Sequence, residues 1–210
     1  ITESTETTGS KTIIRVIAKG EQQTWEPFSI RSERAFNCQR NLYKSRYGNK
    51  LIFEEINHDL AITFQYEWNN SNQYGFVRKA TIINHSANEV QVTLIDGLQN
   101  VLPYGIGSDL QNSTSNLADA YKRSELLADT GLGIYALSAI IVDKAEPSEA
   151  LKANSIWSAG LTNPLYLLSS LQLQQFRNGG TVQQEADVKG MKGAYFINSE
   201  FKLAPNEEKS

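Results

Sequence analysis

Short runs of β-branched and aromatic residues recur about every ten residues, separated by Asn, Gly, Asp or Pro, and this spacing constrains the fold more than any other feature. In the segment 11–18, for example, Ile14 and Val16 alternate with polar or mixed positions, which is the pattern of a half-buried strand. Many short strands between turn residues are typical of antiparallel sandwiches. We therefore expect an all-β fold, a large antiparallel β-sandwich with one or two short helices.

The same pattern predicts where the elements lie. Asn57-His58-Asp59 should form a tight hairpin turn, and the strands at 60–68, 74–83 and 90–95 should make a three-stranded meander. Helical spacing predicts one helix at 117–127 and a weaker one at 146–152. The C-terminal end reads as a strand, a turn and the start of another strand. The strands expected are 11–18, 25–30, 51–56, 60–68, 75–83, 89–95, 133–142, 154–159, 166–174, 181–188 and 193–203.

Length and composition exclude several classes of protein. With 210 residues, 40% apolar and 20% charged, the chain is too hydrophobic for intrinsic disorder and fits one domain. The net charge of -3 supplies no excess of cations for nucleic acid, and no apolar run is long enough to span a bilayer. We expect residues 1–10 to be a polar tail and 11–210 a single sandwich domain, a fragment of a longer enzyme.

Cys38 is the only cysteine, so no intrachain disulfide can form. The compartment therefore stays open, because a chain with one thiol can be stable in an oxidising or a reducing compartment. Arg34 and Arg40 lie close to Cys38 in the sequence and could lower its pKa. Because no partner motif accompanies it, we interpret Cys38 as an inert thiol.

Catalytic, cofactor and metal motifs are absent from the sequence. The only histidines, His58 and His85, fall in expected turns, where a solvated side chain without a special role is the simpler interpretation. Glu54 and Glu55 are adjacent on an expected strand, so their side chains point to opposite faces and cannot work as a glycosidase pair. We predict no catalytic residue, no cofactor and no metal ligand.

Aromatic and amide side chains gather between Phe64 and Phe76. Sugars present flat C–H faces and a rim of hydroxyls, which aromatic rings and Asn or Gln side chains bind together. Trp68 and Tyr74, at the expected loop ends, are therefore candidates for carbohydrate binding or a domain interface. The alternative is that these aromatic residues fill the core of the sandwich, an interpretation we favour for Phe64 and Tyr66.

The run 68–86, which contains Gly75-Phe76-Val77-Arg78 and ends in Asn84-His85-Ser86, resembles the N-terminal β-sandwich of cellobiose- and chitobiose-phosphorylase-like enzymes. The continuation from Val90 to Gly105 resembles an uncharacterised bacterial subgroup of that family. About forty residues resemble the family closely. The rest of the chain resembles it only in the pattern of its expected strands.

This resemblance implies a supersandwich fold of the galactose-mutarotase-like kind and a partner: an α/α-toroid catalytic domain that follows the sandwich. In that family the catalytic residues lie in the toroid, so none is carried over to this chain. The family's sandwich packs on the toroid, helps to form a homodimer and sends a loop towards the active site.

The segment Gly97–Asn116 is the candidate for that loop. Its glycines permit close backbone approach, Pro103 fixes one turn, and Leu98 and Leu102 could anchor it. A loop of about twenty residues in a compact domain usually serves a function or an interface; the alternative is a loop that folds onto its own sandwich. The polar and aromatic candidates in and beside this loop are Asp96, Gln99, Asn100 and Tyr104.

Three functions follow as hypotheses. The first is a non-catalytic sandwich module of a carbohydrate-active enzyme that supports domain packing and substrate binding. The second is a stand-alone carbohydrate-binding module. A mutarotase-like enzyme is third, disfavoured because histidines are few. In each case we expect Arg78, which lies in the middle of a strand, to have a structural role.

Overall fold

The computed structural model describes residues 6–18, 20–113, 115–139 and 152–210. Antiparallel strands dominate, and the helices are short, which confirms the predicted all-β sandwich class. The packing divides the chain into two compact units. Unit 1 holds the residues up to Thr12 together with Leu94–Ser199, and unit 2 holds Ile13–Thr93 with Glu200–Ser210. A single domain over 11–210 stays a prediction, and each unit is described by itself.

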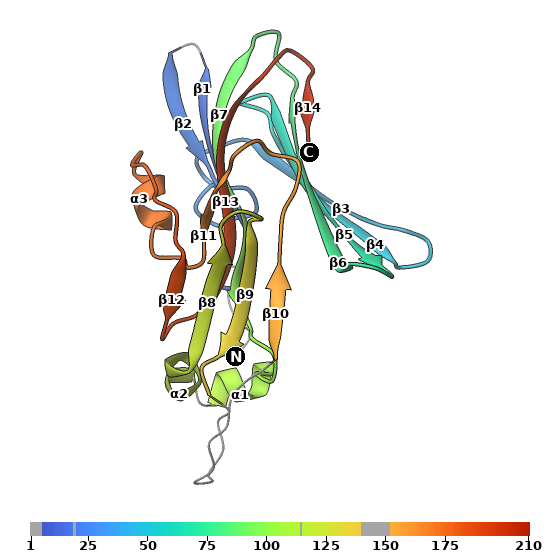
Figure 1. The fold of residues 1–210 in the computed structure, drawn as a ribbon. Coiled ribbons are helices and arrows are strands. Elements are labelled where there is room, and N and C mark those ends of the chain that lie inside the picture. Colours follow the sequence, from blue (N-terminus) through green and yellow to red (C-terminus); the bar gives the residue numbers. More distant parts are fainter. Residues whose placement is uncertain (1–5, 19, 114, 140–151) are drawn as a thin grey trace. The chain divides into compact units, whose positions relative to one another are not determined.

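Unit 2 contains a five-stranded sheet in the order β14-β6-β5-β4-β3, whose long hairpins run side by side in Figure 1. Asn57 pairs with Ile62 across the β4–β5 turn, so the predicted hairpin at Asn57-His58-Asp59 is confirmed. The strands are β3 (Cys38–Lys44), β4 (Lys50–Asn57), β5 (Ile62–Ser71), β6 (Gly75–Asn84) and β14 (Glu208–Lys209). β14 pairs with β6, which confirms the strand, turn and strand expected at the C-terminal end.

The core of unit 2 lies between this sheet and the hairpin of β1 (Gly9–Ala18) with β2 (Glu21–Trp25). Both layers contribute fully buried side chains, and the indole Nε1 of Trp25 donates to Oε1 of Glu55 at 3.0 Å. The buried apolar residues are Ile13, Ile14, Val16, Trp25, Leu60, Ile62, Phe64, Ile82, Val90, Val92 and Leu203.

Unit 1 contains a four-stranded sheet in the order β10-β9-β8-β12. A second sheet, in the order β11-β13-β7-β1-β2, includes three strands that the unit boundary divides: β1, β7 and β13. The remaining elements are β7 (Val90–Val101), α1 (Ser108–Ser113), α2 (Ser115–Ala120), β8 (Lys122–Leu127), β9 (Leu132–Leu137), β10 (Ala153–Ile156), β11 (Leu165–Leu167), α3 (Leu173–Arg177), β12 (Asp187–Lys189) and β13 (Gly193–Leu203).

Tyrosines and glycines build the core of unit 1. Tyr135 of β9 and Tyr195 of β13 pack with Leu126 and Leu168, so both sheets contribute to one cluster. The hydroxyl of Tyr135 donates to the carbonyl of Ala194, and that of Tyr195 to the carbonyl of Gly131, each at 2.6 Å. A methyl group at Gly97 would lie 2.0 Å from the carbonyl oxygen of Tyr195. Close backbone approach therefore requires glycine at position 97.

The helix expected at 117–127 is wrong in its second half. α2 ends at Ala120, and the chain continues as β8 from Lys122. Burial in β8 alternates with period two, and each of its residues pairs with β9. Pairing with a neighbouring strand thus overrides the helical spacing of Tyr121, Ser124 and Leu127.

Several other expected elements also need correction, among them the strand expected at 181–188, of which only Asp187 and Val188 lie in a strand, β12. The strand predicted at 25–30 ends at Trp25, because Pro27 and the turns after it stop the pairing with β1. The segment 166–174 holds a short strand, β11, and then the start of helix α3. β7 leaves the expected meander because it lies between β13 and β1 in the other sheet.

The weaker helix expected at 146–152 lies, apart from Lys152, outside the described residues. At the N-terminal end, β1 begins at Gly9, so the last two residues of the expected tail belong to a strand. No helix in the described part of the chain is long and apolar enough to cross a membrane.

Candidate functional site

One side of the β3–β6 sheet carries apolar side chains far beyond the part that the core of unit 2 covers. Residues that pair across antiparallel strands point to the same face, and this face then repeats at every second residue. We call the uncovered part the distal face. Its residues form two complete cross-strand rows and one partial row towards the turns: Leu42, Phe53, Tyr66 and Ala80; Lys44, Leu51, Trp68 and Arg78; and Asn70 with Phe76.

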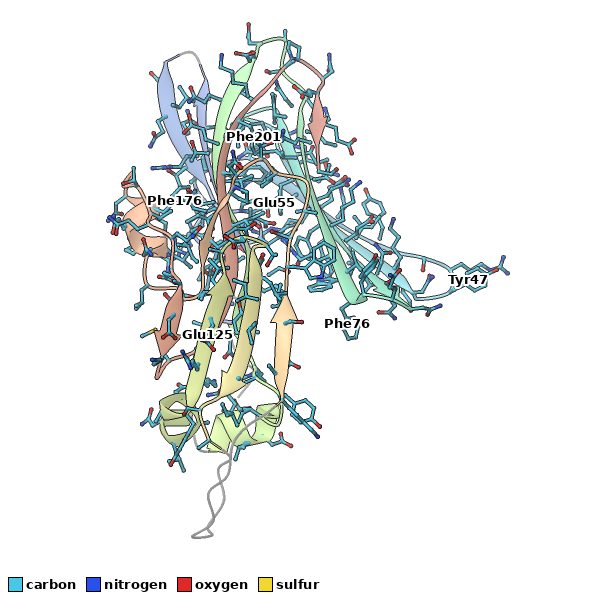
Figure 2. The ribbon with its side chains drawn as sticks, in the orientation of Figure 1. Tyr47, Glu55, Phe76, Glu125, Phe176 and Phe201 are labelled. Atoms are coloured by element: carbon cyan, nitrogen blue, oxygen red, sulfur yellow. The ribbon has the colours of Figure 1, made fainter. Side chains whose placement is uncertain are left out.

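Exposure on the distal face is highest at the edge strand β3 and at the turn end of β6. Leu42 is 64% exposed and Phe76 81% exposed, whereas Tyr66 and Trp68 are half-buried. Figure 2 shows Phe76 and Tyr47 at the turn ends of the hairpins, away from Glu55. Contiguous aromatic and aliphatic side chains that stay partly or fully exposed often mark a binding surface, so this face is the candidate site.

The ring of Tyr66 is held on both sides. Phe53 stacks on it with a centroid distance of 4.9 Å and an interplanar angle of 15°, and the guanidinium of Arg78 lies 4.8 Å from its centroid. Phe28 meets the same ring edge-on at 5.4 Å. Tyr66 therefore supports the face, and Trp68 and Phe76 are the aromatic residues placed to contact a ligand.

Trp68 lies inside β5, three residues before the strand ends, rather than at a loop end as expected. Arg78 and Leu51 are its cross-strand partners. Tyr74 lies in the turn between β5 and β6 and is 57% exposed. Both candidates thus belong to the outer half of one sheet, but only Trp68 belongs to the distal face.

A buried carboxylate marks the border between the covered part of the sheet and the distal face. Glu55 is fully buried, and its Oε2 accepts from the backbone N–H of Phe28 at 2.8 Å and from Nε of Arg40 at 2.6 Å. Phe28 has a φ of 62°, a left-handed backbone that is costly for a bulky residue. We attribute this backbone to its hydrogen bond with Glu55, which holds the ring of Phe28 against Tyr66.

Cys38 pairs across the strands with Asn57, beside this carboxylate. Burial raises the pKa of the Cys38 thiol to about 12, and the negative charge of Glu55 acts in the same direction. The expected lowering by Arg34 and Arg40 is therefore wrong in its net direction: Arg40 does lower the pKa, but burial and Glu55 outweigh it. A thiol that stays protonated is a poor nucleophile, which agrees with the interpretation of Cys38 as inert.

The remaining candidates, in unit 1, are placed differently from the expected loop. β7 continues through Gly97 to Val101, so the irregular segment begins only after the strand, and α1 interrupts it again. Asp96 is buried and accepts from the Thr12 hydroxyl at 2.6 Å. Gln99 is also buried and donates to the carbonyl of Thr8.

Asn100 donates its Nδ2 to the hydroxyl of Thr8, so it joins the same internal contacts. The dense hydrogen-bonding groups of this segment hold β7 against β1 and the residues just before it. Tyr104 differs, because its ring is 51% exposed and lies under the ammonium group of Lys152 at 4.9 Å. The expected apolar anchor Leu102 packs beside a small cluster of Ile106, Ala118 and Leu137.

The two histidines lie at turns, as expected. His58 is exposed, and the Nε2 of His85 lies 2.8 Å from the hydroxyl of Thr63. Within the described residues, no group of three or more His, Cys, Asp or Glu side chains is arranged to hold a metal ion.

Sequence reasoning missed strand β3 and, with it, two residues of the distal face, Leu42 and Lys44. β3 is an edge strand with mostly polar residues, so its alternation is weak. The signal that could have found it is the turn around Gly48, where φ is 71° and the N–H of Ser45 donates to the carbonyl of Lys50.

A scan against protein-family models and a search of curated proteins found no match to this chain.

Proposed function

We propose that this chain is a non-catalytic β-sandwich module of a glycoside phosphorylase- or hydrolase-like enzyme, and that its distal face binds carbohydrate. The observation that supports carbohydrate binding most directly is the cross-strand row of Lys44, Leu51, Trp68 and Arg78, with Phe76 beyond it. In this row an indole ring lies between groups that donate hydrogen bonds, the combination that sugar rings need.

The geometry of the side chains that could perform chemistry supports a module without turnover. The carboxylate of Glu55 is bound by Trp25, Phe28 and Arg40 in a fully buried place. Glu54 points to the opposite face of the sheet, where it accepts from Asn41. Two carboxylates on opposite faces of one strand cannot flank a glycosidic bond.

The direct test of carbohydrate binding is affinity electrophoresis of the chain in gels that contain a single polysaccharide, with cello-, chito- and uronate-based polymers as probes. We expect at least one probe to retard the wild-type chain and the variant Trp68→Ala to lose roughly tenfold in affinity. Trp157, 53% exposed in unit 1, supplies a matched control, because Trp157→Ala removes an exposed indole outside the distal face. No retardation by any probe, or equal losses in both variants, overturns the proposed site.

The same assays separate the module from a catalytic protein. We expect no glycosidase, phosphorylase or mutarotase turnover by the chain on aryl glycosides, on disaccharides with phosphate, or on α-glucose. Clear turnover that disappears on changing His58 or His85 contradicts the proposal.

The alternative function is a stand-alone carbohydrate-binding module, which the position of the distal face on a single sheet also supports. The enzyme module and the stand-alone module differ in the protein domain that each one needs as a partner. The enzyme module requires an α/α-toroid catalytic domain, and a homodimer is part of the same proposal. A reading frame that continues past Ser210 into helix-rich sequence favours the enzyme module, and a stop codon there favours the stand-alone module.

A further inference from the structure

Lys122, the first residue of β8, occupies a position where the strand buries its side chains. Burial alternates along β8, so Lys122 shares its buried face with Ser124 and Leu126, and its cross-strand partner Leu137 is buried as well. Lys122 is only 3% exposed. A lysine is almost never buried to this degree unless other groups pair with its charge, so the groups around its amine decide what it does.

Two short helices supply the partners of this amine. α1 and α2 precede β8 in the chain and lie at the end of the sheet where β8 begins (Figure 1). From α2, Oδ1 of Asp119 accepts from Nζ of Lys122 at 2.7 Å. From α1, Oε1 of Gln111 accepts from the same Nζ, and Gln111 is 1% exposed. An amine, a primary amide and a carboxylate therefore meet inside unit 1.

The carboxylate contacts both of the other groups through one oxygen atom. Oδ1 of Asp119 lies 2.7 Å from Nζ of Lys122 and 3.5 Å from Nε2 of Gln111. Two neighbours of these residues belong to a buried apolar cluster: Ala118 precedes Asp119 in the chain, and Leu137 pairs with Lys122. Apolar surroundings limit the access of water, which competes with an amine for a carbonyl carbon.

An amine, an amide and a carboxylate in this arrangement can form a new amide bond between two side chains. In water this exchange is slow, but holding the reacting groups together raises their effective concentration to roughly 10⁵–10⁸ M in the best intramolecular cases. Because Nζ of Lys122 donates to Oε1 of Gln111, the carbonyl carbon Cδ is only one bond beyond the atom that Nζ contacts. The amine must lose a proton before it can attack, and Oδ1 of Asp119 is placed to accept that proton.

We propose that unit 1 forms an intramolecular isopeptide bond between Lys122 and Gln111, with Asp119 as the proton carrier. Nζ of Lys122 gives a proton to Oδ1 of Asp119 and bonds to Cδ of Gln111, and the Cδ–Nε2 bond breaks. Asp119 passes its proton to Nε2, which also takes a second proton from Nζ and leaves as ammonium. One alkylammonium and one primary amide become one secondary amide and one ammonium ion, so the reaction needs no other reactant.

The bond joins α1 to the first residue of β8 and closes the segment between them into a covalent loop. It forms once in each chain, which distinguishes it from enzymatic turnover. The inference goes beyond the proposed carbohydrate function and does not depend on it, because the distal face belongs to unit 2 and these three residues belong to unit 1.

The test is the intact mass of the purified 210-residue chain, measured by mass spectrometry under denaturing conditions. We expect most molecules to be lighter than the sequence requires by the mass of one ammonia. Cleavage on the N-terminal side of aspartate then locates the bond, because it releases the peptide 109–118, which contains Gln111, and the peptide 119–128, which contains Lys122. These two peptides should remain joined.

Three variants test the assigned roles. Lys122→Arg and Asp119→Asn should both keep the full mass of their sequences, because a guanidinium stays protonated and a side-chain amide does not accept the proton. Lys189→Arg is the matched control. Lys189 also pairs with an aspartate in unit 1, at 3.0 Å from Asp187, but its side chain is 64% exposed. The control should lose one ammonia as the wild type does.

Each outcome supports or overturns the inference. A wild-type chain of full mass means that Lys122 and Asp119 form only a buried ion pair, and it overturns the inference. A loss of ammonia with the two peptides separate has another origin, such as Asn178, and overturns it too. A loss that persists in Lys122→Arg has the same meaning, and one that persists in Asp119→Asn overturns the role of Asp119. The wild-type mass decides the existence of the bond even if a variant does not fold.

Discussion

The two halves of the β3–β6 sheet have the same strands and the same facing pattern, yet their side chains meet different surroundings. In the half near the core, Glu55, Phe64 and Ile82 form one cross-strand row and are at most 3% exposed. In the distal half, Leu42 and Phe76 point to the same face and are 64% and 81% exposed. Both halves carry large apolar side chains on this face. They differ because other residues of the chain pack over the near half and not over the outer part of the distal half.

The cover over the near half comes from the end of β2 and the turn that follows it. Trp25 and Phe28 both bind Glu55, and Phe28 reaches as far as the ring of Tyr66. Among the described residues, the stacked and edge-on ring contacts of this sheet end at Tyr66 and do not extend to Trp68 or Phe76. This apolar face, which continues past its cover, is the reason that the distal face is the candidate site.

The largest difference should appear when one phenylalanine is truncated in each half. Phe64→Ala removes a ring that is 2% exposed and should lower the free energy of unfolding by about 3–5 kcal/mol. Phe76→Ala removes a ring that is 81% exposed and should change it by less than about 0.5 kcal/mol. Urea unfolding of both variants measures the contrast. Similar losses in the two variants would mean that the distal face is packed rather than uncovered.

The second largest loss of stability should come from removing the charge of Glu55, at the border between the covered part of the sheet and the distal face. Glu55→Gln keeps the shape of the side chain but weakens three hydrogen bonds, including the charged one from Arg40, and should cost about 2–3 kcal/mol. Because Glu55 holds the backbone of Phe28, near-ultraviolet circular dichroism should also change. Glu54→Gln, on the opposite face, is the control and should have a small effect. If Glu55→Gln is as mild as its control, Glu55 does not organise the border.

A smaller loss is expected from Arg78→Lys. The guanidinium of Arg78 lies 4.8 Å from the centroid of the Tyr66 ring, and a compact lysine ammonium makes a smaller contact with the ring, so the melting temperature should fall by a few degrees, for a loss of about 0.5–1 kcal/mol. Lys79→Arg, one residue further on the other face, controls for a change of cation type. An unchanged melting temperature for Arg78→Lys would remove Arg78 from the support of the face.

The smallest effect at neutral pH concerns Cys38. Its pKa is raised to about 12 in the folded chain, against about 8.5 for a free thiol. Between these values the unfolded state releases the proton and the folded state keeps it, so this group favours unfolding increasingly as pH rises from 8.5 towards 12. The stability of the wild type relative to Cys38→Ser should therefore fall over this range in urea unfolding. A difference that stays constant with pH contradicts the raised pKa.

Local alternation was a good guide for three strands that are paired on both sides, although β8, which is also paired on both sides, was an exception. The strands around 51–56 and 75–83 and the strand at 193–203 lie where the pattern predicts them, and the Asn57 turn follows from its residues. At 122–127 the pattern failed because helical and strand spacing overlap over six residues, and only the pairing with β9 decides between them.

The candidate sites show a different limit of sequence reasoning. Asp96 and Gln99 are polar residues of the kind that binding loops contain. Their hydrogen-bond partners, however, are Thr12 and Thr8, more than eighty residues away along the chain. Trp68 was found from its type, whereas Lys44 was not, because only the register of β3 with β4 puts it on the face of Trp68. Contacts between residues far apart in the chain decide the roles of Asp96 and Gln99 and the position of Lys44. A local sequence pattern does not contain such contacts.

The central claim, that the distal face is open to a ligand, is tested most directly by fluorine NMR of the chain labelled with 5-fluorotryptophan. The three tryptophans report three environments: Trp25 is fully buried, Trp157 is exposed in unit 1, and Trp68 lies on the distal face. Each resonance is assigned from a Trp→Phe variant. On titration with the polysaccharide that retards the chain most strongly in affinity electrophoresis, we expect the Trp68 resonance alone to shift saturably, while Trp25 and Trp157 stay unchanged. A Trp68 resonance that does not move, with every uronate-, cello- and chito-based probe, contradicts the claim.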